Sequence, residues 1–124
     1  MRLLLDTHVV LSWMGHGRAL SEGAQRALGD TTNQVMLSAV VAWEIAINRA
    51  LGKLHAPADL IEQVLASDVV RLPISIEHAA AVEHLPHHHG DPFDRMLIAQ
   101  AAIERATLVS GDDGMRAYDV PVLW

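Results

Sequence analysis

Two kinds of hydrophobic pattern alternate along this chain: short unbroken apolar runs, and longer stretches whose apolar residues recur at helical spacing. Short apolar runs that end at polar residues are typical of strands buried on both faces of a parallel sheet. Runs of this kind predict strands at residues 2–5, 35–37, 69–72, 107–110 and 120–123. Because such strands are apolar on both faces, helices are expected to cover both sides of their sheet.

Helical spacing fills the intervals between these strands, and several of the expected helices begin at a residue that commonly caps a helix N-terminus. Ser21, Ser38, Ser75 and Asp91 are such residues. The predicted helices cover residues 9–14, 20–28, 38–51, 59–67, 75–85 and 91–106. Repeated alternation of strands and helices predicts an α/β/α sandwich around a mainly parallel sheet, built as one domain over residues 1–124.

The helix that begins at Asp91 contains an acid in an unexpected place. Asp91 is a suitable N-cap and Pro92 suits the first helical position, so Asp94 is the third residue of the helix. Leu97 and Ile98, three and four residues further on, lie on the same side of the helix as Asp94 and are apolar. Asp94 is therefore predicted to face the edge of the core, where an unpaired charge is costly.

Three other acids occupy comparable positions. Asp6 directly follows the first predicted strand, and Asp112 lies two residues beyond the strand at residues 107–110. In open parallel sheets, functional residues gather beyond the carboxyl ends of strands. Glu44 interrupts an apolar helix. Each acid alone also has a structural interpretation: Asp6 as a helix cap, Glu44 as a partner of Arg49, Asp94 as a complement to its helix N-terminus, and Asp112 as a turn former.

Taken together, the four acids predict a metal site. Carboxylates gathered in a partly buried site raise one another's pKa values, and a divalent cation relieves this conflict. The chain has no cysteine, which excludes thiol catalysis and cysteine-bound zinc, and oxygen ligands favour Mg²⁺, with Mn²⁺ as the other option. Two such ions activate water and stabilise a leaving oxygen at phosphorus. Metal-dependent phosphodiester hydrolysis is the leading prediction, and an aspartyl-phosphate or receiver-type domain is the weaker alternative.

Overall charge first argues against a nucleic-acid partner, because the 124 residues carry a net charge of −6. Setting the four candidate acids aside leaves 11 acids against 9 Lys and Arg, or −2, so most of the excess is predicted to be local. No apolar stretch approaches the length of a membrane span, and the N-terminus lacks the layout of a signal peptide. We therefore expect a cytoplasmic protein with no membrane association.

Several motifs occur in an order that resembles a known family, the PIN-domain ribonucleases, and in particular the VapC-type toxins of type II toxin-antitoxin systems. These motifs are Asp6-Thr7-His8, Trp43-Glu44-Ile45, Asp91-Pro92-Phe93-Asp94-Arg95 and Ser110-Gly111-Asp112. The resemblance implies that Asp6, Glu44 and Asp94 are the core metal-binding acids. It makes Asp112 the fourth, although many relatives space this acid differently, so Asp113 is a second candidate for that role.

Further expectations follow from the same resemblance. Thr7 and Ser38 would orient carboxylates or bound water, and Arg95 would contact either a scissile phosphate or a neighbouring acid. The family also implies an RNA substrate, a cognate antitoxin protein and a homodimer. A PIN-like domain that only binds a partner, without catalysis, is the alternative. Trp13, Trp43 and Trp124 are interpreted as core or interface residues rather than as base-stacking platforms.

Overall fold

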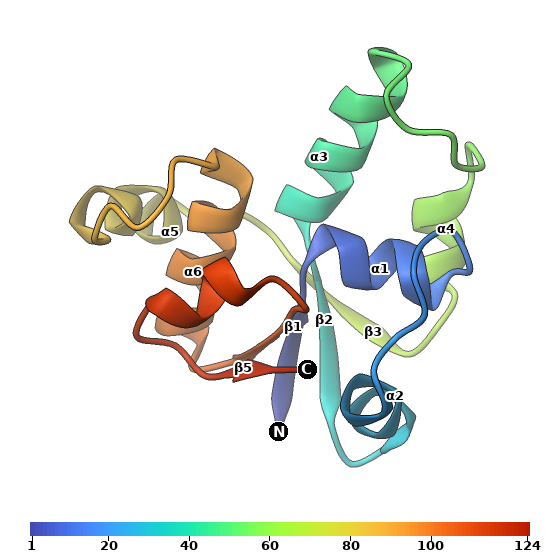
Figure 1. Ribbon diagram of the computed structural model, residues 1–124, viewed down its shortest axis with the longest axis horizontal. Coiled ribbons are helices and arrows are strands. Elements are labelled where there is room, and N and C mark those ends of the chain that lie inside the picture. Colours follow the sequence, from blue (N-terminus) through green and yellow to red (C-terminus); the bar gives the residue numbers. More distant parts are fainter.

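A sheet of five parallel strands forms the centre of the computed structural model, which describes all of residues 1–124 (Figure 1). The strands lie in the order β3-β2-β1-β4-β5, and each neighbouring pair is parallel. Their bounds are β1 Arg2–Leu5, β2 Gln34–Ser38, β3 Val69–Leu72, β4 Thr107–Val109 and β5 Val122–Leu123. The predicted parallel α/β sheet is confirmed.

Helices cover both sides of this sheet. They are α1 Thr7–Trp13, α2 Glu22–Gly29, α3 Ala39–Ala50, α4 Leu60–Leu65, α5 Ile76–Ala81 and α6 Pro92–Glu104, with short 3₁₀ helices η1 Val82–His84 and η2 Asp113–Ala117. In Figure 1, α1, α2 and α4 lie on one side of the sheet, α5 and α6 lie on the other, and α3 rises from its carboxyl edge. None of these helices has the length and apolar character needed to cross a bilayer.

The central strand β1 anchors the hydrophobic core. Leu3, Leu4 and Leu5 are completely buried, although successive side chains of a strand point to opposite faces. Both faces of β1 are therefore covered by helices, as expected for a strand that reads as a continuous apolar run. The backbone N–H of Asp6 still donates to the carbonyl of Val109 at 3.2 Å, so the chain is fixed up to the last residue before α1.

Several predicted elements differ from the structure at their ends. Helix α1 starts at Thr7, two residues earlier than expected, because Asp6 itself caps the helix. The helix predicted for residues 75–85 ends as an α-helix at Ala81 and tightens into η1. Leu85 is extended because a residue before proline disfavours helical backbone angles. Strand β5 has two residues rather than four, and Asp112, which is also interpreted from sequence as a turn former, caps the short 3₁₀ helix η2.

The order of the strands determines where the chain can build a site. The connection from β1 to β2 runs through α1 and α2, whereas the connection from β3 to β4 runs through α5 and α6 on the other side of the sheet (Figure 1). Ligands of open parallel sheets bind where neighbouring strands send their connections to opposite faces. In this chain, that point lies beyond the carboxyl ends of β1 and β4.

A buried polar network ties α3 to α6 behind this edge of the sheet. Gln100 is completely buried, and its Oε1 accepts a hydrogen bond from the Ser38 hydroxyl at 2.6 Å. Its side-chain amide donates to the carbonyl of Pro73 at 3.3 Å and faces His78 Nδ1 at the same distance. His78 Nε2 in turn lies 3.0 Å from Glu104. Because each group has a partner, burial of this network is compatible with a stable core.

Replacement of Gln100 by leucine is expected to lower the free energy of unfolding by about 1–3 kcal/mol, since it leaves the Ser38 hydroxyl and the Pro73 carbonyl without a partner. Urea denaturation of the purified variant measures this change. Ala102→Gln, at an exposed position on the same helix, is the matched control and should stay within about 0.5 kcal/mol of the wild type. Equal stability of Gln100→Leu and wild type would contradict a stabilising role for the network.

Candidate active site

Three of the four candidate acids, Asp6, Asp94 and Asp112, are positioned by the start of a helix. Asp6 caps α1, and its Oδ1 accepts a hydrogen bond from the backbone N–H of Val9 at 2.8 Å. Asp94 lies in the first turn of α6, where Asp91 Oδ1 accepts from the backbone N–H groups of residues 93 and 94. Asp112 caps η2 in the same way, through the N–H of Gly114 at 2.9 Å. These local caps fix the acids without help from a bound ion.

The structure brings the four acids into one electrostatic cluster. Burial first, and then the negative charges of Asp91, Glu44, Asp112 and Asp6 in that order, together raise the pKa of Asp94 to about 7. Such an effect requires the carboxylates to lie near one another in a poorly solvated place. The acids predicted from separate parts of the sequence therefore lie close enough to Asp94 for their charges to act on it.

Asp6 is the most buried of these acids, with only 3% of its surface exposed. Burial raises the pKa of Asp6, while interactions with the Ser110 hydroxyl, the Val9 amide and His8 work in the opposite direction. The Ser110 hydroxyl also accepts from the backbone N–H of Asp112 at 3.1 Å. Ser110 thus links two candidate acids, a role that sequence reasoning missed although the hydroxyl stands at the end of β4, two residues before Asp112.

The two hydroxyls expected to orient carboxylates behave differently. Thr7 Oγ1 donates to Glu44 Oε1 at 2.5 Å, so the first residue of α1 holds the acid of α3 in place. Ser38 does not contact a carboxylate, because its hydroxyl donates to Gln100 and accepts from the N–H of Val40. Ser38 is accordingly a helix cap in the buried network rather than a partner of the acids.

Arg95 and Asp113 also lie differently from Asp94 and Asp112. Arg95 is buried, and its guanidinium donates to the Pro86 carbonyl at 2.8 Å and to the Tyr118 hydroxyl at 3.2 Å, with two further carbonyls nearby. It holds the loop before α6 rather than contacting the acids.

Asp113 is fully exposed and lies 3.9 Å from Arg116, whereas Asp112 interacts with both Asp6 and Asp94. The geometry favours Asp112 as the fourth acid of the cluster.

The donor set of the cluster fits a hard divalent cation. All four groups are carboxylates, and two of them have raised pKa values that a nearby positive charge would lower. No three carboxylate or imidazole groups are spaced to hold a single ion directly. Mg²⁺ needs no such cage, because it is usually bound by one or two carboxylates and retains several waters.

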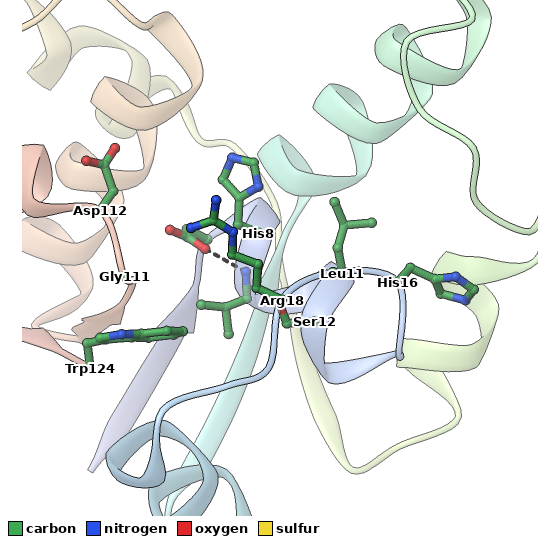
Figure 2. A pocket seen from close by; sticks show the side chains of 11 residues that line it. His8, Leu11, Ser12, His16, Arg18, Gly111, Asp112 and Trp124 are labelled. Atoms are coloured by element: carbon green, nitrogen blue, oxygen red, sulfur yellow. Dashed lines mark hydrogen bonds between the residues drawn. The ribbon is translucent and has the colours of Figure 1, made fainter.

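A pocket of about 590 Å³ opens beside the cluster, lined by Asp6 and Asp112. Figure 2 shows Asp112 and Trp124 on one side of it and His8 on the other, with Arg18 extending from its loop toward His8. Sequence reasoning did not select Arg18 or His8 as site residues. Arg18 follows a glycine-rich turn and His8 occupies the exposed face of α1, and neither position gives a local signal of its role.

An acid-lined pocket at the carboxyl edge of a parallel α/β sheet lies where proteins with open sheets of this kind bind their ligands. The family model described as "PIN domain" matches residues 3–121 of this chain. The chain therefore belongs to the PIN-domain family.

Its relatives include two curated proteins of Mycobacterium tuberculosis. Ribonuclease VapC16 is 35% identical over 98 residues, which are 76% of this chain but only 65% of VapC16. Ribonuclease VapC22 is 28% identical over 122 residues, covering 96% of this chain and 93% of VapC22. In the crystal structure of VapBC2 from Rickettsia felis bound to promoter DNA, a chain aligns with a TM-score of 0.73 at 15% identity, covering 98% of this chain and 97% of that one. The predicted resemblance to VapC-type PIN proteins is confirmed.

The buried acids should make the metal-free protein less stable as the pH rises. Asp94 has a pKa of about 7 in the folded protein and an ordinary value of 3.8, so between these values the folded chain holds a proton that the unfolded chain has released. Stability is therefore expected to fall between about pH 4 and pH 7 and to level off above this range. Thermal melting in EDTA across this range measures the trend.

Asp94→Asn should flatten this pH dependence and melt at a higher temperature than the wild type at pH 8, because the amide cannot ionise. Asp113→Asn is the matched control, since Asp113 is fully exposed, and it should keep the slope of the wild type. An unchanged slope in Asp94→Asn would show that the buried charge of Asp94 is not its cause.

Proposed function

We propose that this chain is a metal-dependent endoribonuclease toxin that hydrolyses RNA phosphodiester bonds and is neutralised by a cognate antitoxin. One observation carries the proposal: Asp6, Glu44, Asp94 and Asp112, from four separate elements, form a single cluster of interacting carboxylates at the carboxyl edge of the sheet. Support comes from family membership and from the ribonuclease names of the relatives VapC16 and VapC22.

In this proposal Asp6 and Asp94 hold Mg²⁺ or Mn²⁺, because they are the acids whose raised pKa values a cation would correct. Glu44 and Asp112 would complete the site through metal-bound water, since no three of the acids are spaced to hold one ion directly. A bound divalent cation makes a water more nucleophilic at neutral pH and stabilises the leaving oxygen, so no amino-acid nucleophile is needed. The protein's contribution is to position these acids, and Thr7 does so for Glu44 through a 2.5 Å hydrogen bond.

We extend the proposal to the partners of the chain. An antitoxin partner is supported by the crystal structure of VapBC-5 from Mycobacterium tuberculosis, described as a member of the VapBC family of toxin-antitoxin systems, which aligns with a TM-score of 0.59 at 20% identity over 94% of this chain and 89% of that one. A single-stranded segment or loop is the form of RNA proposed as substrate, since sequence-specific recognition of RNA generally uses unpaired bases. The homodimer implied by family resemblance belongs to the same proposal.

Purified protein should cleave RNA in Mg²⁺ or Mn²⁺ and lose this activity in EDTA. Asp94→Asn and Asp112→Asn are each expected to reduce the cleavage rate by about a hundredfold, because each removes a charged oxygen ligand. Asp113→Asn is the matched control for Asp112→Asn and should cleave at close to the wild-type rate, since Asp113 points to solvent and Arg116. Cleavage rates on a labelled RNA measure all three.

Two results would contradict the proposal in different ways. Full RNA cleavage by Asp94→Asn would show that the carboxylate cluster is not needed for catalysis. A well-folded wild-type protein that cleaves no RNA in either metal but binds an antitoxin would instead support the non-catalytic alternative.

Expression of the wild-type chain in a bacterial host is expected to slow growth, and expression of Asp94→Asn is expected not to, because only the wild type cleaves RNA. Co-expression of a small protein encoded beside this chain should restore growth if that protein is the antitoxin. Growth curves with matched protein levels provide the measurement. If the wild type and Asp94→Asn slow growth equally, growth inhibition does not depend on RNA cleavage at this site.

A further inference from the structure

The pocket beside the carboxylates contains groups that the proposed metal site does not use. Besides Asp6 and Asp112, its lining includes Arg18, His8 and Trp124, whose side chains Figure 2 shows on the same side of α1 as Asp112. Its volume of about 590 Å³ falls in the range of about 300–1,000 Å³ typical of small-molecule sites. The pocket is therefore large enough for a nucleotide, and it is continuous with the acids.

The indole of Trp124 has a fixed position at this pocket. Gly111 lies directly against it, since a Cβ atom at position 111 would come within 2.9 Å of the ring. Glycine at this position lets the ring pack closely on the loop that carries Asp112. Even so, 42% of Trp124 stays exposed, and its exposed part borders the pocket. From sequence, Trp124 is interpreted as a core or interface residue, but a packed and half-exposed indole at a pocket is also a suitable surface for stacking a base.

Arg18 supplies a free positive charge at the same pocket. It is exposed, and no carboxylate lies within 4.0 Å of its guanidinium, in contrast to Arg2 and Arg116. Figure 2 shows its side chain reaching over the pocket toward His8 rather than away into solvent. A guanidinium presents several donors in a planar fork that matches the oxygens of a phosphate. In a chain with a net charge of −6, this local cation distinguishes the pocket from the surrounding surface.

We propose that this pocket is a nucleotide subsite that binds one unpaired ribonucleotide of the substrate next to the scissile phosphate, with its base on Trp124 and its phosphate on Arg18. The subsite rests on the ribonuclease function proposed above. An acidic peptide segment is the competing occupant, since Arg18 would also bind a carboxylate. The exposed indole favours the nucleotide, because stacking on Trp124 uses the flat face that a base has and an acidic side chain lacks.

Binding of the four 5′-ribonucleoside monophosphates and of a short single-stranded RNA, measured calorimetrically in EDTA, tests the subsite without catalysis. Trp124→Leu and Arg18→Gln are each expected to weaken binding about tenfold, and Trp124→Phe should recover most of the loss through its ring. Arg26→Gln, an exposed arginine outside the pocket, is the matched control and should bind as the wild type does. Thermal melting verifies folding, and Arg18→Gln keeps the test valid if Trp124→Leu is unstable.

Cleavage kinetics supply the second measurement. Trp124→Leu and Arg18→Gln should raise KM about tenfold, leave kcat within about twofold and alter the preferred cleavage sequence. Unchanged KM and binding in both variants, with cleavage still dependent on Asp94, would overturn the subsite alone. Nucleotide binding that depends on Trp124 and Arg18, in a wild type that cleaves no RNA, would support the subsite and overturn the ribonuclease function. Displacement of the nucleotide by a short polyglutamate peptide at lower concentration than by RNA would identify the peptide as occupant.

Discussion

The starts of helices gathered at the carboxyl edge of the sheet are the constraint on which the site depends. Helices α1, α3 and α6 begin there, capped by Asp6, Ser38 and Asp91, and each carries or precedes a candidate acid. The positive end of a helix dipole stabilises a nearby negative charge by about 0.3–1 kcal/mol. The same local interaction therefore fixes where Asp6 and Asp94 lie and offsets part of the repulsion between them, whereas Glu44, further along α3, is held by the Thr7 hydroxyl.

The helix dipoles stabilise the charges of these acids only in part. The caps alone therefore do not explain the raised pKa of Asp94. Burial raises the pKa of Asp94 to about 7 despite its place at a helix N-terminus, so the desolvation of its charge outweighs the dipole. Such a conflict persists only where the surrounding structure resists relaxation. Here β1 is buried on both faces, and the Ser38–Gln100 hydrogen bond holds α3 against α6. The packing of β1 and the Ser38–Gln100 hydrogen bond thus keep the acids close together although their charges repel one another.

The parts of the fold and site that sequence predicts are those encoded by neighbouring residues. Apolar runs located the strands, and the Asp91–Pro92 cap placed Asp94 on the correct side of α6. Contacts between distant segments were not predictable in this way: the Ser38 hydroxyl finds Gln100, 62 residues further along the chain, rather than a carboxylate. Asp112 and Asp113 are identical in type, and only the three-dimensional path of η2 directs one to the cluster and the other to solvent.

The proposed ribonuclease function requires an acidic chain to recognise RNA at short range. Salt screens surface charges beyond about 8–10 Å, so the net charge of −6 matters less at the pocket than the groups that line it. Cations held by the carboxylates would reverse the sign of the charge there, and Arg18 adds a further positive group. Because little long-range attraction draws RNA to such a protein, discrimination falls to contacts that only an accessible base can make. A half-exposed indole beside the acids provides such a contact, and base-paired RNA, whose bases are stacked within the helix, cannot use it.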